Sequence, residues 1–178
     1  MSINKRIIII VGSLILVVLI AFISYWMYAA PAMSADVNCR GTIKVLYLED
    51  SGIALEELEK SFNFDDVTTE AIINSPIDYR YIVVDNIISN NSEETFTKLR
   101  SEVDIKGITV VGTPFMPEPE VSYLSVYPGE NEGILIYFLV KAEEKTDEEI
   151  LTAIKEGKIY IKASAKLIAN PKWEVNIS

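Results

Sequence analysis

Carboxylates and hydroxyls are the side chains that could do chemistry here, because the 178 residues include no histidine and a single cysteine, Cys39. Without histidine there is no Ser-His-Asp or Cys-His nucleophile, and the commonest metal ligand of proteins is missing. One thiol cannot build a thiolate zinc site or a Cys-x-x-Cys redox pair. No glycine-rich phosphate loop occurs either. We therefore predict no catalytic residue, no cofactor and no bound metal.

Two aspartates and a threonine form the predicted binding site. Asp50, Asp85 and Thr113 each lie at or after an apolar run of strand-like composition. In a doubly wound sheet the carboxyl ends of the strands meet at one edge, and ligands bind in the crevice outside it. We expect that crevice to bind a small ligand or a sugar. The carboxylates leave one further alternative, a hydrolase that works by acid–base catalysis without histidine.

Phe115 and Met116 open the stretch FMPEPE, which carries two prolines. Prolines keep such a segment stiff and extended, a form that the grooves of partner proteins recognise. Phe115 and Met116 are therefore the candidate interaction residues. The preferred interpretation of the segment is a rigid connector between the two halves of the domain.

Three side chains are candidates for covalent modification. Asn90 and Asn176 each begin an Asn-x-Ser triplet, which is the acceptor pattern of N-glycosylation. Cys39 has no second cysteine in the chain to pair with. It is therefore either an unpaired thiol or one half of a disulfide to a second chain.

The beginning of the chain predicts a membrane anchor. Residues 7–30 carry no charge over 24 residues. As a helix they would reach about 36 Å, and the hydrocarbon core of a bilayer is about 30 Å thick. A secretory signal has a shorter apolar core, although Ala30-Pro31-Ala32 would suit a signal peptidase that cleaves after Ala32. An uncleaved anchor is the preferred interpretation.

The charges around this run set the expected orientation and the division of the chain. Lys5 and Arg6 precede it, and cationic flanks stay in the cytoplasm. The domain that follows is then extracytoplasmic, at the cell surface or outside it. The expected segments are a cytoplasmic tail at 1–6, a single-pass transmembrane helix at 7–30, a juxtamembrane linker at 31–41 and an extracytoplasmic α/β domain at 42–178.

Charge restricts the partners of this domain. The whole chain has a formal net charge of −10. Beyond residue 30 there are 26 acidic and 14 basic side chains, a net charge of −12. Such a surface repels phosphate backbones, so nucleic acid is excluded as a partner. The partners that remain are the membrane, through residues 7–30, and a protein of unknown identity.

Hydrophobic periodicity predicts an α/β fold. Strands and helices alternate in the first half of the domain, with strands at 42–50, 66–73, 79–88 and 106–112 and helices at 53–62 and 91–103. The second half reads as strands at 121–127, 133–140, 158–167 and 173–177 with one helix at 146–157. Thr146 and Glu149 form a capping box at the start of that helix, and apolar and polar residues alternate along 158–167, as in a strand with one face in water. Apolar rather than alternating strands are typical of a parallel sheet covered on both faces. We expect a flavodoxin-like mixed sheet extended by C-terminal antiparallel strands.

The stretches IKVLYLED, DYRYIVVDN and FTKLRSEVDIKGITVVGTPF resemble the front half of the class I glutamine-amidotransferase-like fold, including its ThuA-like relatives. The resemblance covers residues 43–114. It would place the catalytic cysteine of that family at Thr113, followed by Pro114, which has no N–H to stabilise an oxyanion. The catalytic histidine is absent as well. The resemblance therefore implies a binding or structural derivative and no amidotransferase activity.

A second resemblance leads to an alternative fold. The stretch EEILTAIKEGKIYIKASAKL, at 148–167, resembles the end of LEA14-type β-sandwich domains. That relationship would make residues 92–103 a strand and not a helix.

The predicted function follows from three features: the expected membrane anchor, a compact core and the lack of a recognisable set of catalytic residues. We expect a membrane-anchored domain that acts by non-covalent contact, as an accessory or scaffold subunit of a membrane or cell-surface complex. The alternatives are the ligand-binding or sugar-binding domain and the histidine-free hydrolase.

Overall fold

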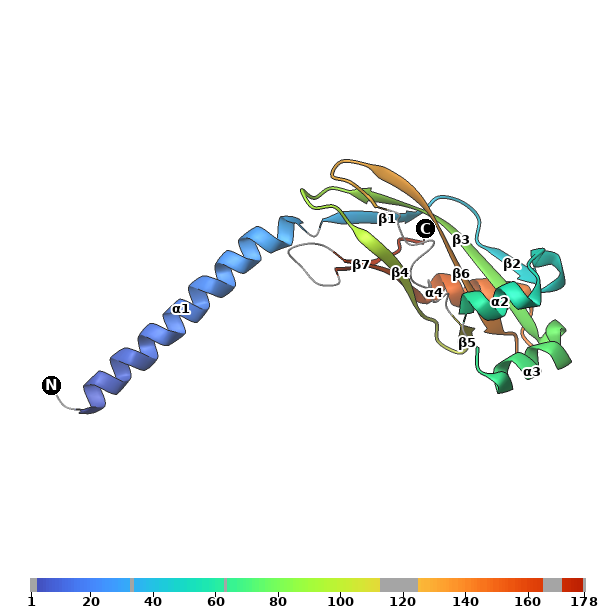
Figure 1. Cartoon of the computed structure of the whole chain (residues 1–178), viewed down its shortest axis with the longest axis horizontal. Coiled ribbons are helices and arrows are strands. Elements are labelled where there is room, and N and C mark those ends of the chain that lie inside the picture. The colour runs from blue at the N-terminus through green and yellow to red at the C-terminus, as the bar shows by residue number, and fades with distance from the viewer. Residues whose placement is uncertain (1–2, 33, 63, 113–124, 165–170, 178) are drawn as a thin grey trace.

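The computed structural model describes residues 3–32, 34–62, 64–112, 125–164 and 171–177, and within the first helix it describes the side chains of residues 11–25. Helix α1 projects from one end of a body made mainly of strands (Figure 1). In chain order the elements are α1 (Ile3–Ala32), β1 (Ala35–Cys39), β2 (Lys44–Tyr47), η1 (Glu49–Ser51), α2 (Leu55–Phe62), α3 (Asp66–Asn74), η2 (Pro76–Asp78), β3 (Tyr79–Asn90), β4 (Thr97–Asp104), β5 (Thr109–Gly112), β6 (Asn131–Lys141), α4 (Asp147–Glu156), β7 (Lys158–Ser164) and β8 (Lys172–Glu174).

Strand β3 organises the larger of two sheets. Its twelve residues pair antiparallel with β6 on one side. On the other side β3 pairs with two strands in succession, with β2 along residues 80–83 and with β1 along residues 86–90. Strand β5 adds a short partner at the end of β6. All of these pairs are antiparallel.

Strands β4, β7 and β8 form the smaller sheet, and both of its strand pairs are antiparallel. The alternation expected for β7 is confirmed, because Ile159, Ile161 and Ala163 are buried while Lys158 is exposed and Tyr160 is half-buried. The smaller sheet therefore has one dry face and one face in contact with solvent.

The main core lies between the two sheets and helix α4. Because side chains alternate along a strand, every second residue of β3 and β6 points into this core. Its members with 0% exposure come from both sheets, from α4 and from the isolated bridge between Phe96 and Val126: Ile82, Val84, Ile88, Phe96, Val126, Phe138, Val140, Ile150, Ile154 and Ile159.

A second apolar cluster covers part of the other face of the larger sheet. There α2 and α3 pack over the end of the sheet where β3 begins (Figure 1). The buried members of this cluster are Leu48, Leu58, Phe62, Ile72, Tyr79, Tyr81 and Leu139. Both faces of β3 are thus apolar at this end, which explains why its sequence shows no alternation.

The predicted flavodoxin-like sheet is wrong. A strand that is buried on both faces looks the same in sequence whether its neighbours are parallel or antiparallel. The parallel strand expected at 66–73 is helix α3, which begins after Asp65, whose carboxylate accepts a hydrogen bond from the Thr68 backbone N–H at 2.8 Å. The structure is a small, sheet-rich α/β domain built from two antiparallel sheets.

The helix expected at 91–103 is also wrong, because residues 97–104 form β4. Tertiary pairing with β7 overrides the helical spacing of the apolar residues there. A strand in this region is what the β-sandwich alternative required, although the resemblance to that family stays a prediction.

The predicted membrane span at 7–30 is contradicted as well. Within the part of the chain that the structure describes, no helix combines the length and the apolarity needed to cross a membrane. The predicted linker at 31–41 also contains an element that the sequence did not indicate. Residues 35–39 are β1, with Val37 only 3% exposed in the main core.

Candidate functional site

The structure separates the two aspartates of the predicted binding site. Asp50 lies in η1, beyond the end of β2 that pairs with Arg80, and it lines a hollow of about 240 Å³. Asp85 lies on β3, on the side of Arg80 that faces away from Asp50. Five residues separate Arg80 from Asp85, which is about 17 Å at the rise of a strand. Its carboxylate accepts hydrogen bonds from the Arg40 guanidinium at 3.2 and 3.3 Å.

The other predicted site residues do not join Asp50 or Asp85. Thr113, Phe115 and Met116 lie outside the described residues. Among the residues that are described, no group of three or more His, Cys, Asp or Glu side chains could hold a metal ion. A strand-end crevice also requires parallel strands, whereas every strand pair of the two sheets, as far as the structure describes them, is antiparallel.

The two glycosylation candidates have different environments. Asn90 is 1% exposed, and its amide donates to the backbone carbonyls of Glu94 at 2.7 Å and Val126 at 2.8 Å. Its carbonyl oxygen accepts from the Ser92 hydroxyl at 2.6 Å, so the side chain ties the end of β3 to the following segment. Asn176 is exposed, and its amide donates to the Asn38 side chain at 3.3 Å.

Cys39 is a half-buried free thiol at the end of β1. Its Sγ atom donates a hydrogen bond to the Gly41 carbonyl at 3.3 Å. Both alternatives for Cys39, an unpaired thiol and a disulfide to a second chain, stay predictions.

An apolar groove beside α2 is the surface feature most suited to binding. It has a volume of about 530 Å³ and lies where α2 stops covering the outer face of the larger sheet. We call it the α2 groove. It is lined by Ile53, Glu57, Leu58, Lys60, Ser61, Phe62, Tyr81, Val83, Leu135 and Tyr137.

The floor of the α2 groove comes from neighbouring positions of two paired strands. Val83 of β3 pairs with Tyr137 of β6, and Leu135 follows on the same face. Leu135 is 58% exposed although it sits in the middle of an eleven-residue strand. An exposed leucine alone needs no explanation, but a leucine beside a half-buried tyrosine and a valine forms a continuous apolar strip.

Aromatic rings form the wall between the groove and the second cluster. The Phe62 ring meets the rings of Tyr81 and Tyr137 edge to face, with centroids 6.4 and 6.1 Å apart. Phe64 stacks on Phe62 at 5.3 Å. Such pairs have defined geometry and hold the wall rigid. Burial, and then the neighbouring Tyr137, raises the pKa of Tyr81 to about 12, so its hydroxyl stays protonated near neutral pH.

The rim of the groove carries balanced charges. On α2, Lys60 pairs with Glu56 at 3.2 Å, and Glu57 lines the groove without an ion pair in the described part of the chain. On the sheet, Lys44 sits opposite Val83, and the Arg40–Asp85 ion pair stands beside Leu135. These six charges sum to zero in a molecule that is strongly acidic overall.

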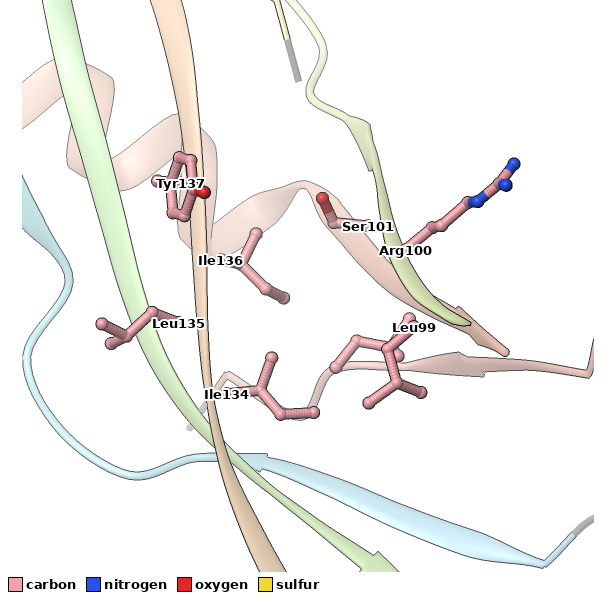
Figure 2. Close-up of a pocket in the computed structure, with 8 residues that line it drawn as sticks. Leu99, Arg100, Ser101, Ile134, Leu135, Ile136 and Tyr137 are labelled. Atoms are coloured by element: carbon pink, nitrogen blue, oxygen red, sulfur yellow. The ribbon is translucent and has the colours of Figure 1, made fainter. Parts of the chain in front are cut away.

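A smaller cavity lies between the two sheets, where β4 faces β6. Figure 2 shows Leu99 of β4 and Ile134 and Ile136 of β6 converging on it. Its volume is about 20 Å³, and these three side chains are at most 7% exposed. It has room for one water molecule and is a packing defect of the core.

Sequence reasoning identified one side of the α2 groove and missed the other. The helical spacing of Leu58 and Phe62 predicted the helix that forms the wall. The strip at Val83, Leu135 and Tyr137 could not be found, because an exposed apolar position in a strand looks like a buried one. No protein-family model matches the chain, and a search of curated proteins found none that is significantly similar to it.

Proposed function

We propose that this protein is a non-catalytic binding subunit that holds an amphipathic helix of a partner protein in the α2 groove. The observation that carries the proposal is the open side of the apolar strip of Val83, Leu135 and Tyr137, where Leu135 is 58% exposed and no element in the described part of the chain covers it. Val83 and Tyr137 also pack against the second apolar cluster, but Leu135 belongs to neither cluster, so its exposed side chain is surplus to folding. An uncovered apolar patch of this kind marks a site of association.

The position of the groove selects a helix as the occupant. The strip lies on the face of a sheet, where the backbone N–H and C=O groups are already paired between strands. An extended peptide lying there would leave its own backbone groups without partners, whereas a helix satisfies its own. The apolar face of a helix fits such a groove, because its side chains at positions i, i+3, i+4 and i+7 all point toward the groove.

The dimensions of a helix define how a single partner helix would lie. A helix with its side chains is about 10 Å wide, and neighbouring helices pack about 8–10 Å apart. The partner helix would lie on the sheet beside α2, over Leu135 and Tyr137. It would continue the helical layer that α2 and α3 begin over one end of the sheet.

The balanced rim predicts how the complex responds to salt. Because the six rim charges sum to zero, the partner is held by apolar burial and not by long-range attraction. Affinity for the partner helix should therefore change by less than about twofold between 50 and 500 mM salt, since screening acts on unbalanced charge.

Site-specific photo-crosslinking in the native cell tests this function. A photoreactive amino acid at Leu135 should give an adduct with one partner, mapped to the apolar face of a helix. The same amino acid at Tyr127, which is 55% exposed but away from the groove, is the matched control. An extended partner segment, or the same adducts from both positions, would contradict the proposal.

A substitution sharpens the same test. Leu135→Asp places a charge at the centre of the strip and should abolish binding of the crosslinked helix, made as a peptide, while leaving the melting temperature nearly unchanged. Ile77→Asp is the control, because Ile77 is 70% exposed in η2 and does not line the groove. Retained binding by Leu135→Asp would place the partner elsewhere.

A further inference from the structure

A row of three cations crosses the solvent face of the smaller sheet. Arg100 of β4 pairs with Lys162 of β7, which pairs in turn with Lys172 of β8, so the three side chains stand side by side on one face. With neighbouring strands about 4.8 Å apart, the row spans about 10 Å. We call these three residues the cation row.

This row is unfavourable for folding by itself. Like charges directly opposite one another on paired strands repel and destabilise the sheet. The repulsion stands out in a chain with a net charge of −10, which has few cations to place. A row of three cations therefore needs a counter-charge beside it.

One carboxylate already sits beside the cation row. Glu102 pairs with Lys162 and, at 2.6 Å, with Lys172. Hydrogen bonds from Lys162 and then Lys172 lower the pKa of Glu102. Lys172 also lies over the Tyr160 ring, 3.7 Å from its centroid. The lysines are thus arranged to hold a carboxylate between them.

Arg100 has no such partner. Its side chain turns away from the cavity of Figure 2 and toward solvent. No ion pair or hydrogen bond of its guanidinium occurs in the described part of the chain, in contrast to Arg40 and Arg80. The planar guanidinium of arginine can donate two parallel hydrogen bonds to one carboxylate.

We propose that the cation row binds an acidic segment of a partner protein, whose carboxylates pair with Arg100 and share Lys162 and Lys172 with Glu102. The inference concerns a different surface from the α2 groove and does not depend on it. Charge complementarity carries it, and the carboxylate of Glu102 shows which anion the lysines accept. Two or three acidic side chains of one segment can reach across the 10 Å of the row.

Glu102 competes with the partner for the two lysines. Its removal should therefore strengthen binding, whereas removal of the cations should weaken it. A purely structural role of the row predicts the opposite for Glu102, because a loss of its ion pairs would only loosen the sheet. Because the two roles predict opposite effects of removing Glu102, the proposal can be tested before the partner is known.

A decamer of glutamate, labelled with a fluorophore, is the probe for anisotropy titrations with the full chain at 50 mM salt. The double variant Arg100→Gln/Lys162→Gln should bind it about fivefold to tenfold more weakly, as expected for two solvent-exposed ion pairs. Glu102→Gln should bind it more tightly than the unaltered chain. Lys60→Gln, on α2, is the matched control and should bind as the unaltered chain does.

Salt and competing anions complete the experiment. Binding should weaken strongly by 500 mM salt, since exposed charges are screened. The proposal is overturned if the decamer does not bind, if Arg100→Gln/Lys162→Gln binds it unchanged, or if Glu102→Gln weakens binding. It is also overturned if phosphate or vesicles of anionic lipid bind the row more tightly than the decamer does.

Discussion

At the scale of single residues, Arg80 shows how the fold accommodates a buried charge. Its side chain is 8% exposed, and its Nε donates to the Asp147 carboxylate at 2.7 Å. Its Nη1 donates to the carbonyls of Ile77 and Tyr79, and the guanidinium lies 3.7 Å from the centroid of the Tyr47 ring. A buried cation persists only when its donors are paired in this way. The network joins the start of β3 to the start of α4.

Tyr81 predicts a loss of stability at high pH. Its pKa is raised to about 12 from an ordinary value of 10.0, so the folded state binds the phenolic proton more tightly than the unfolded state. The resulting stability is fully present below pH 10 and should disappear as the pH rises toward 12. Urea unfolding midpoints between pH 8 and pH 12 measure this decline.

Tyr81→Phe is the control for that pH series. Phenylalanine has no hydroxyl to ionise, so the decline between pH 10 and pH 12 should become shallower in this variant. Tyr127→Phe, at an exposed position, should leave the decline as it is in the unaltered chain. Equal declines in the unaltered chain and Tyr81→Phe would assign the effect to other groups.

At the scale of elements, the start of helix α4 can be predicted completely from the local sequence. The Glu149 backbone N–H donates to the Thr146 hydroxyl at 3.3 Å, and the Thr146 backbone N–H donates to the Glu149 carboxylate at 2.8 Å. Donation to this carboxylate from the Thr146 backbone N–H, and then from the Thr146 hydroxyl at 2.9 Å, lowers the pKa of Glu149. A capping box needs only residues three apart, so the prediction from sequence is confirmed.

The same helix offers a matched pair of threonine substitutions. Thr146→Ala removes the cap and should reduce the free energy of unfolding by about 1 kcal/mol. Thr152→Ala, at an exposed position inside α4, should raise it by a few tenths of a kcal/mol, because alanine has the higher helix propensity. Urea denaturation measures both, and a stabilising Thr146→Ala would contradict the role of the cap.

Strands and helices whose identity depends on distant partners were predicted less well. Residues 66–73 have the β-branched composition of a strand, yet capping by Asp65 and burial of Ile72 make them α3. Residues 97–104 have apolar spacing close to that of a helix, yet β7 lies beside them and they become β4. In both cases tertiary contacts outweigh intrinsic preferences that differ by less than about 1 kcal/mol per residue.

At the scale of the whole molecule, the described side chains of α1 are separate from the domain. Residues 11–25 are all exposed, so they bury no area against the sheets. By contrast, β1 follows directly and places Val37 in the main core. The boundary of the domain therefore lies before residue 34 and not at 42. The location of the domain outside the cytoplasm stays a prediction.

Two truncations test this boundary. A chain that begins at Ser34 should unfold at the same urea midpoint as the full chain, because Ser34 still accepts the hydrogen bond from the Asn91 backbone N–H at 3.0 Å. A chain that begins at Arg40 loses β1 and the burial of Val37, which is worth about 1.5–3 kcal/mol by itself. It should unfold at a clearly lower midpoint, and equal midpoints for the two truncations would contradict the assignment of β1.

The sequence by itself determined the features that depend on near neighbours. These are the capped start of α4, the alternation of β7 and the absence of histidine-based chemistry. Only the tertiary structure decided the pairing of β3 with three strands, the separation of Asp50 from Asp85, the open strip of the α2 groove and the cation row. The physical reason is that capping and periodicity act within a few residues, whereas strand pairing joins residues tens of positions apart. Which apolar or charged side chains then meet is decided by the register between strands, and no single stretch of sequence contains that register.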